Sequence, residues 1–331
     1  MRLSLSVLCC VVAVSSEDRC LSLNLAVGIG PGKSGSTALA MTLMQHGGAA
    51  VEVGSAALGN QSCCGSELYY FNRVGHEPDC EEYSRFFATP FSEQPHMWRF
   101  EKTPGYTSHT VTPFYLRTMS RNVKLLFTYR SPVLLDVSLH RHVKSTVPYN
   151  LWFDARRQAH ERYLKCRGDG YSPRDFLTEV ELDKRCGQGE PRPPFEVPVG
   201  SRTQFKSILT GHSIRRWAHV FPRSDIMCIA QKEMYDTVRT IRRLNSFLGV
   251  SMSLGVDNIN TSVPALAGTS ADAADQERYD LEKYEQYEAI IRASYKSSYD
   301  AAENNMSIAQ YAKLIVKYDL PDEVAKVCYN R

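Results

Sequence analysis

The sequence predicts an α/β fold, a three-layer sandwich with a central parallel sheet and helices on both faces. Three short stretches, at residues 25–29, 123–129 and 225–230, are apolar enough to form buried strands. Each is followed by a turn and then by a stretch whose apolar residues recur at helical spacing. Such alternation of buried strands with helices is typical of parallel sheets that are covered on both faces.

The first strand leads into the most informative stretch of the chain. The apolar run at 25–29 ends at a turn rich in glycine and hydroxyl side chains, and residues 37–46 resume as a helix. A strand, a glycine-rich turn and a helix together aim backbone N–H groups and a helix N-terminus at a phosphate. The turn is therefore interpreted as a P-loop-like phosphate-binding loop. Its ligand-binding residues would be Gly32, Lys33, Ser34, Gly35, Ser36 and Thr37.

Two loop patterns fit this turn. The nucleoside-triphosphate pattern G-x-x-x-x-G-K-[ST] matches at Gly32-Lys33-Ser34, but its first glycine would fall at Val27. The pattern G-x-x-K-x-G-[ST] matches from Gly30 to Ser36. It is typical of sulfotransferases that use 3′-phosphoadenosine 5′-phosphosulfate (PAPS). The loop by itself leaves both ligands open.

Composition and the N-terminus bound the remaining possibilities. The chain has 331 residues and a formal net charge of +3, which is too small to indicate nucleic-acid binding. Residues 1–16 resemble a secretory signal peptide, because an apolar run at 3–14 follows Arg2 and precedes small residues. The run is too short to span a bilayer, which needs about 20 residues. We expect one domain over 24–331, in the Golgi lumen or secreted.

The cysteines are consistent with that compartment. The chain has ten cysteines, and the even number left after loss of Cys9 and Cys10 permits disulfides. Cys166 and Cys186 bracket a loop-like stretch and are the predicted pair. There is no C-x-x-C pair, and the histidines lie far from the cysteines in sequence, so no metal site is expected. Possible glycosylation acceptors are Asn60, Asn260 and Asn305.

Two further side chains between the first and second predicted strands of the core could carry chemistry. Glu67 precedes an aromatic run at 69–71 and is either a surface carboxylate or a general base whose pKa desolvation would raise. Lys102 lies where the apolar pattern of the preceding residues becomes irregular, just before the loop that Pro104 and Gly105 enforce. It is either solvated or a second lysine on the anionic ligand. A short additional strand is expected at 49–53.

The strand at 123–129 runs into Arg130, and a helix is expected at 133–144. Arg130 would lie at the carboxyl end of a central strand, where open α/β sheets bind ligands. Ser138 would lie about two turns into the helix. The basic stretch 140–167 is either a solvated helical face or a surface for an anionic polymer. A basic amphipathic helix is predicted at 235–248, ended by Gly249.

Taken together, these pieces resemble the PAPS-dependent carbohydrate sulfotransferases, most closely the heparan sulfate glucosaminyl class. The loop pattern is matched from Gly30 to Ser36, and the family's Glu before an aromatic pair is matched by Glu67. An E-K-[ST]-P-x-Y segment is matched at 101–106. An apolar strand that runs into R-[DS]-P, with a Ser eight residues after the Arg, is matched by Arg130 and Ser138. The four motifs occur in the family's order over residues 24–145.

The resemblance implies a role for each of these residues. Lys33 and the loop N–H groups would hold the 5′-phosphosulfate, and Arg130 and Ser138 would hold the 3′-phosphate. Glu67 would take the proton of the acceptor's hydroxyl or amino group, and Lys102 would stabilise charge on the sulfuryl group. The acceptor would be a carbohydrate, with the basic stretch 140–167 as a surface for an anionic glycan.

Some features depart from the family or favour other functions. The family's Glu follows its second strand closely, which makes Glu52 a competitor for the role of base. The late K-G-R stretch that touches the nucleotide has no counterpart in residues 251–275. Two alternatives therefore stay open: a nucleotide-dependent kinase that uses magnesium, and a non-catalytic glycan-binding protein.

Overall fold

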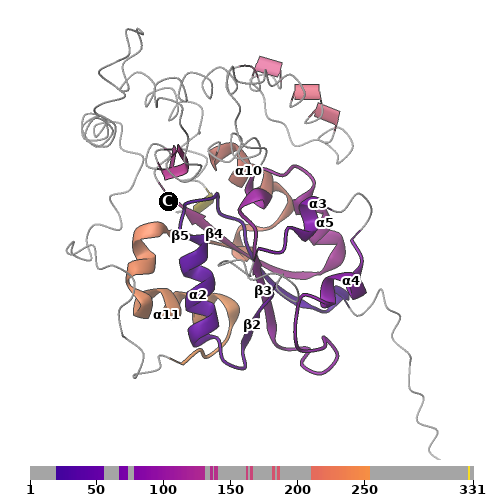
Figure 1. The fold of residues 1–331 in the computed structure, drawn as a ribbon, viewed down its shortest axis with the longest axis vertical. Coiled ribbons are helices and arrows are strands. Elements are labelled where there is room, and N and C mark those ends of the chain that lie inside the picture. The colour runs from indigo at the N-terminus through magenta and orange to yellow at the C-terminus, as the bar shows by residue number, and fades with distance from the viewer. Residues whose placement is uncertain are drawn as a thin grey trace, which may run out of the picture.

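The computed structural model describes residues 20–55, 67–73, 78–130, 135–136, 138–140, 162, 165–166, 181–182, 185–186, 210–253 and 327–328. Within this part, five parallel strands form one sheet in the order β2-β3-β1-β4-β5 (Figure 1). The strands are β1 (Asn24–Gly28), β2 (Val51–Val53), β3 (Trp98–Lys102), β4 (Asn122–Tyr129) and β5 (Ile226–Ala230). The predicted α/β class with a central parallel sheet is confirmed.

Helices cover both faces of the sheet. On one face, α2 (Ser36–His46) and α11 (Thr237–Leu248) pack on side chains such as Phe100 and Leu126. On the other face, a second apolar cluster includes Phe71, Tyr83 and Trp217. It gathers α3 (Tyr70–Arg73), α4 (Cys80–Ser84), the 3₁₀ turn η1 (Pro104–Thr107), α5 (Thr112–Met119) and α10 (Thr210–Val220) against the sheet.

The apolar strands lie close to their predicted places. β1, β4 and β5 coincide with the predicted stretches within one residue at each end, and β2 occupies the end of the one expected at 49–53. Helix α11 begins after Asp236, whose side chain accepts the Arg239 N–H at 2.9 Å. It ends at Gly249, which has a left-handed φ of 67°. Glycine is favoured at such a C-terminal position.

Strand β3 was not predicted. The sequence pattern suggests that Lys102 lies at the irregular approach to a loop, whereas it is the last residue of a strand that lies between β2 and β1. All five residues of β3 are buried, although Arg99, Glu101 and Lys102 are ionisable. Such a strand has no apolar run to reveal it. Its charges can be buried because they are satisfied by partners far away in the sequence.

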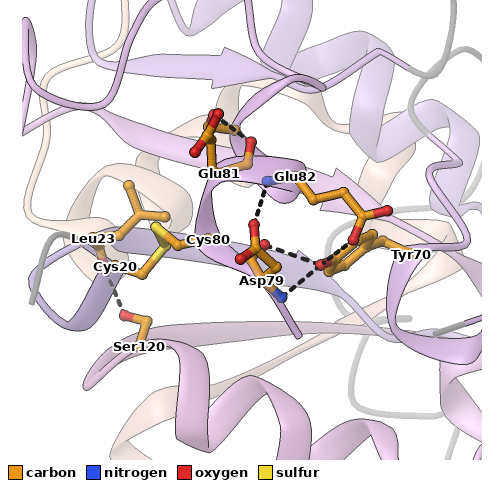
Figure 2. The surroundings of a disulfide bond; sticks show 9 residues. Cys20, Leu23, Tyr70, Asp79, Cys80, Glu81, Glu82 and Ser120 are labelled. Atoms are coloured by element: carbon orange, nitrogen blue, oxygen red, sulfur yellow. Dashed lines mark hydrogen bonds between the residues drawn. A yellow bond between two sulfur atoms is a disulfide. The ribbon is translucent and has the colours of Figure 1, made fainter. Parts of the chain in front are cut away.

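Three disulfides join described residues: Cys20–Cys80, Cys166–Cys186 and Cys228–Cys328. The predicted Cys166–Cys186 pair is confirmed, and both cysteines lie in helical residues. Cys20–Cys80 ties the residues before β1 to the first turn of α4 (Figure 2). Disulfides of this kind restrict the unfolded chain and so stabilise the fold.

Several sequence-based predictions fall on other parts of the chain. The signal peptide at 1–16, the three glycosylation acceptors and most of the basic stretch 140–167 lie outside the described residues. Among the helices that are described, none has both the length and the apolar character to cross a membrane.

Candidate active site

The phosphate loop is fastened to the neighbouring strand β4. The Ser34 hydroxyl lies 2.6 Å from the carbonyl oxygen of Pro31 and 2.7 Å from the hydroxyl of Thr128 on β4. Gly30 lies so close to this contact that a Cβ there would be 1.8 Å from Thr128 Oγ1 and 2.4 Å from Thr128 O. Any other side chain at Gly30 would therefore displace the loop from the sheet.

Ser34 is placed differently from the expectation for a ligand-binding hydroxyl. Its side chain is fully buried, and its N–H donates to Pro31 O at 3.3 Å. The hydroxyl and the backbone N–H of Ser34 thus both shape the loop. In the nucleoside-triphosphate pattern this serine would hold magnesium, and its hydroxyl is here already engaged with protein atoms.

The loop ends at the N-terminus of α2. Lys33 and Gly35 both adopt left-handed backbone conformations, with φ values of 69° and 98°. Gly35 is the N-cap of α2, and the first turn of α2 contains no acidic residue. The first N–H groups of a helix have no partner within the helix, and its dipole places partial positive charge there. Together with the half-buried Lys33, this end of α2 suits an anion.

Lys102 and Glu67 meet beside this loop. Lys102 ends β3, and β1 ends opposite it, since Gly28 is the register partner of Lys102. The buried Lys102 ammonium is ion-paired with Glu67 and donates to the Thr37 hydroxyl in the first turn of α2 at 3.2 Å. The Glu67 side chain remains 21% exposed, whereas that of Lys102 is 0% exposed. The carboxylate is thus fixed on one side and reachable from the other.

Tyr69 is a member of this group that the sequence analysis did not single out. Its hydroxyl donates to Glu67 Oε2 at 2.6 Å. The backbone at Tyr69 is left-handed, with a φ of 56°, and its N–H donates to the Thr103 hydroxyl at 3.1 Å. Left-handed conformations are uncommon for residues other than glycine. The aromatic run after Glu67 was the only available signal, and it did not distinguish Tyr69 from its neighbours.

Glu52, the competing base, has a different environment. It lies on β2 and is ion-paired with the buried Arg99, its register partner on β3. Its carboxylate also accepts the backbone N–H groups of Ala88 and Thr89 at 2.7 and 3.0 Å. Burial lowers the pKa of Arg99, and the Glu52 carboxylate opposes that shift. A carboxylate with this many fixed donors stabilises the fold.

A third carboxyl of the region, Glu101, is fully buried on the opposite side of β3 from Lys102. Its oxygens accept hydrogen bonds from Tyr83 at 2.9 Å and from Tyr106 at 3.1 Å. Burial raises the pKa of Glu101 to about 8, and the two tyrosine hydroxyls counteract that rise. Burial also raises the pKa of both tyrosines well above the usual value. Glu101 is thus mostly protonated at neutral pH.

Arg130 and Ser138 lie beyond the carboxyl end of β4. Arg130 directly follows the strand and is half-buried, and Ser138 is half-buried within helical residues. Because β4 pairs with β1, Arg130 leaves the sheet at the same edge as the phosphate loop. The contact that each would make with a 3′-phosphate remains a prediction.

In the part of the chain that the structure describes, the acidic groups that a magnesium-dependent kinase needs are not gathered at this edge. Asp225 precedes β5 and is ion-paired with Lys124 at 2.7 Å, near the amino ends of the strands. The phosphate loop lies at the carboxyl ends. Among the described residues no cluster of acidic, histidine or cysteine side chains is arranged to hold a metal ion.

The comparisons with known proteins can be stated briefly. No protein-family model and no curated protein sequence matches the chain. Among solved structures, the chain is similar to a sulfotransferase from Alicyclobacillus acidocaldarius, with 16% identity and a TM-score of 0.44 over 87% of this chain and 98% of that one. It is also similar to the sulfotransferase domain of the Synechococcus PCC 7002 olefin synthase, with 12% identity and a TM-score of 0.38 over 88% and 94% of the two chains. These likenesses are distant.

Proposed function

We propose that the protein is a PAPS-dependent sulfotransferase that modifies a hydroxyl or amino group of a carbohydrate. One observation carries this proposal. The Lys102–Glu67 ion pair lies beside the glycine-rich loop and touches the first turn of α2 through Thr37. An anion site and a reachable carboxylate are thereby brought together at the ligand-binding edge of a parallel sheet.

The loop residues fit a bisphosphorylated nucleotide. The left-handed backbone at Lys33 and Gly35 turns the chain into α2, whose first N–H groups would bind the 5′-phosphosulfate with the Lys33 ammonium. Ser34 would contribute by holding the loop to Thr128. Arg130 and Ser138 would bind the 3′-phosphate, since Arg130 leaves the sheet at the same edge as the phosphate loop and Ser138 follows it in the chain. These groups can neutralise a phosphate leaving group without a metal ion.

Glu67 is proposed as the general base. PAPS, when bound, supplies an activated sulfuryl group. The acceptor oxygen or nitrogen forms a bond to that sulfur while the bond from sulfur to the bridging phosphate oxygen breaks, and Glu67 accepts the acceptor's proton. Lys102 orients the Glu67 carboxylate through one oxygen and Tyr69 through the other. Group transfer of this kind depends mainly on positioning and charge stabilisation.

The proposed compartment is the secretory pathway. Three disulfides join described cysteines, and disulfides persist mainly in oxidising compartments. The signal-like N-terminus agrees with this location. This compartment and the basic stretch 140–167, which lies mostly outside the described residues, favour a carbohydrate acceptor.

A transfer assay tests the proposal. The full chain is incubated with ³⁵S-labelled PAPS and a panel of desulfated glycans, and labelled product and released 3′-phosphoadenosine 5′-phosphate (PAP) are both measured. We expect label on at least one glycan and none with Glu67→Gln. Glu52→Gln is the matched control, because it changes another ion-paired glutamate and should keep activity. Label transfer by Glu67→Gln at the wild-type rate would contradict the assigned base.

A further inference from the structure

We infer that the buried Glu101 is a positioning residue for the transfer reaction, which holds Glu67 in place through Tyr106. This inference rests on the proposed function, in which Glu67 is the base. Glu101 does not touch the site itself, since it lies on the opposite side of β3 from Lys102. Its influence would pass through the backbone of residues 69–71, which begin two residues after Glu67.

That backbone is held by two hydroxyl groups from the segment after β3. The N–H of Tyr69 donates to the Thr103 hydroxyl at 3.1 Å, and the N–H of Phe71 donates to the Tyr106 hydroxyl at 3.2 Å. Phe71 is fully buried, so its N–H has no access to solvent as a substitute partner. Thr103 and Tyr106 thus fix the two residues that flank Tyr70, and they set where the chain bearing Glu67 enters the site.

The side chain between them is held by another element. The Tyr70 hydroxyl lies 3.0 Å from Asp79 O and 3.1 Å from Glu82 Oε2, and it accepts the Asp79 N–H at 2.8 Å (Figure 2). Asp79 caps α4, which the Cys20–Cys80 disulfide joins to the residues before β1. The segment 69–71 is therefore clamped between the start of α4 and the turn after β3.

Glu101 determines how Tyr106 can serve this clamp. The Tyr106 hydroxyl has one proton, and it donates that proton to Glu101, 3.1 Å from Oε2. With the proton directed at Glu101, a lone pair of the same oxygen is left to accept the Phe71 N–H. Without an acceptor at Glu101, the hydroxyl could rotate, and the Phe71 N–H could lose its partner.

Tyr83 provides an internal control. Its hydroxyl also donates to Glu101, at 2.9 Å, and its side chain is also fully buried in the same aromatic cluster. This hydrogen bond ends at Glu101 and does not reach the 69–71 backbone. Tyr83→Phe and Tyr106→Phe therefore each remove one hydroxyl donor to Glu101, but only the second one frees the Phe71 N–H.

The experiment compares these two variants by kinetics, melting temperature and amide hydrogen exchange of residues 67–73. We expect Tyr106→Phe to lower kcat by about tenfold or more, since a displacement of about 1 Å can cost about 100-fold. The KM for PAPS should stay unchanged, because the phosphate loop is not altered. The Phe71 amide should exchange faster in Tyr106→Phe. Tyr83→Phe should keep both kcat and the exchange rate of this amide, even where its melting temperature falls as far.

Equal losses of kcat in the two variants, in step with their melting temperatures, would overturn the inference and leave Glu101 a structural residue. If Tyr106→Phe does not fold, Glu101→Met takes its place, because it removes both acceptor oxygens at similar volume. The same kcat loss at unchanged KM is then expected. A wild-type chain without any transfer activity would instead contradict the proposed function, and the exchange comparison would still test the clamp.

Discussion

The two ends of β3 present the same chemistry in two different settings. At the amino end, the buried Arg99 is ion-paired with Glu52, and at the carboxyl end, the buried Lys102 is ion-paired with Glu67. Glu52 also accepts hydrogen bonds from the backbone N–H groups of residues 88 and 89, whereas Glu67 accepts a hydrogen bond from the Tyr69 hydroxyl. Only the second pair lies next to a glycine-rich loop and a helix N-terminus.

This difference shows that an ion pair does not by itself identify a functional site. A buried pair whose members are fully satisfied serves the fold. A pair becomes a candidate for catalysis when one member stays reachable and an anion site adjoins it. The position along the strand decides between the two cases, because ligands bind parallel sheets at the carboxyl ends of their strands.

The largest expected effect separates the two glutamates by turnover. Removal of a general base costs about 10²- to 10⁴-fold in rate, so Glu67→Gln should lower kcat by that amount. Glu52→Gln should leave kcat near the wild-type value and should lower the melting temperature. Steady-state kinetics of PAP release measure kcat for both variants. If the two variants lost activity equally, the distinction between the two ends of β3 would be wrong.

A second prediction separates the two cations by stability. Arg99→Leu leaves a mostly buried Glu52 without its charge partner and should cost about 3–5 kcal/mol in the free energy of unfolding. Lys102→Met should cost less, because Glu67 is more exposed and can regain water. Urea unfolding of the two variants, followed by circular dichroism, gives the comparison. A larger loss for Lys102→Met would show that the carboxyl-end pair is the more structural of the two.

A third prediction concerns Glu101, the β3 carboxyl that has two tyrosine partners. Its pKa in the folded protein is about 8, above the unfolded value of 4.5, so the folded state retains a proton that the unfolded state releases. Stability should therefore fall as the pH rises from about 4.5 to 8, and Glu101 adds no further slope above that range. Glu101→Gln should flatten this part of the curve. Unfolding curves at several pH values with an unchanged slope in the variant would contradict the assignment.

The smallest expected effect is that of Ser34→Ala. Loss of the Ser34 hydroxyl removes its contacts with Pro31 O and Thr128 and should cost about 1 kcal/mol of stability. Cofactor binding should weaken only slightly, because the hydroxyl faces the sheet. Calorimetric titration measures the PAP affinity of Ser34→Ala, with Ser36→Ala at the start of α2 as a comparison. A large loss of PAP affinity in Ser34→Ala would place the hydroxyl at the ligand.

Much of the fold could be predicted from local patterns. β1, β4 and β5 are apolar runs, and the loop before α2 has a recognisable glycine pattern, so their prediction needed no distant contact. β3 could not be found in this way, since Arg99, Glu101 and Lys102 are tolerated inside the sheet only by partners from β2, α4 and the segment before α3. The charged residues of β3 indicate exposure in the sequence, whereas their tertiary contacts allow them to be buried.

The candidate site was predictable only in part, because some of its residues belong to local motifs and others depend on tertiary contacts. Lys33 belongs to a local motif, and the resemblance pointed to Glu67 and Lys102, which the structure brings together. Tyr69 was missed because its contact with Glu67 accompanies a left-handed backbone that a tyrosine rarely adopts. The contact of Ser34 with Thr128 was not predicted, because a sequence pattern does not show which side of a loop a hydroxyl faces.

The most direct test of the central claim is a thermal unfolding measurement with PAP or with ATP and magnesium. A ligand present at about 100 times its dissociation constant adds about 2.7 kcal/mol of stability. We predict that PAP raises the melting temperature of the wild-type chain, that ATP with magnesium does not, and that Lys33→Ala loses most of the shift. A shift with ATP and magnesium alone, or with neither ligand, would contradict the assignment of this loop to PAPS.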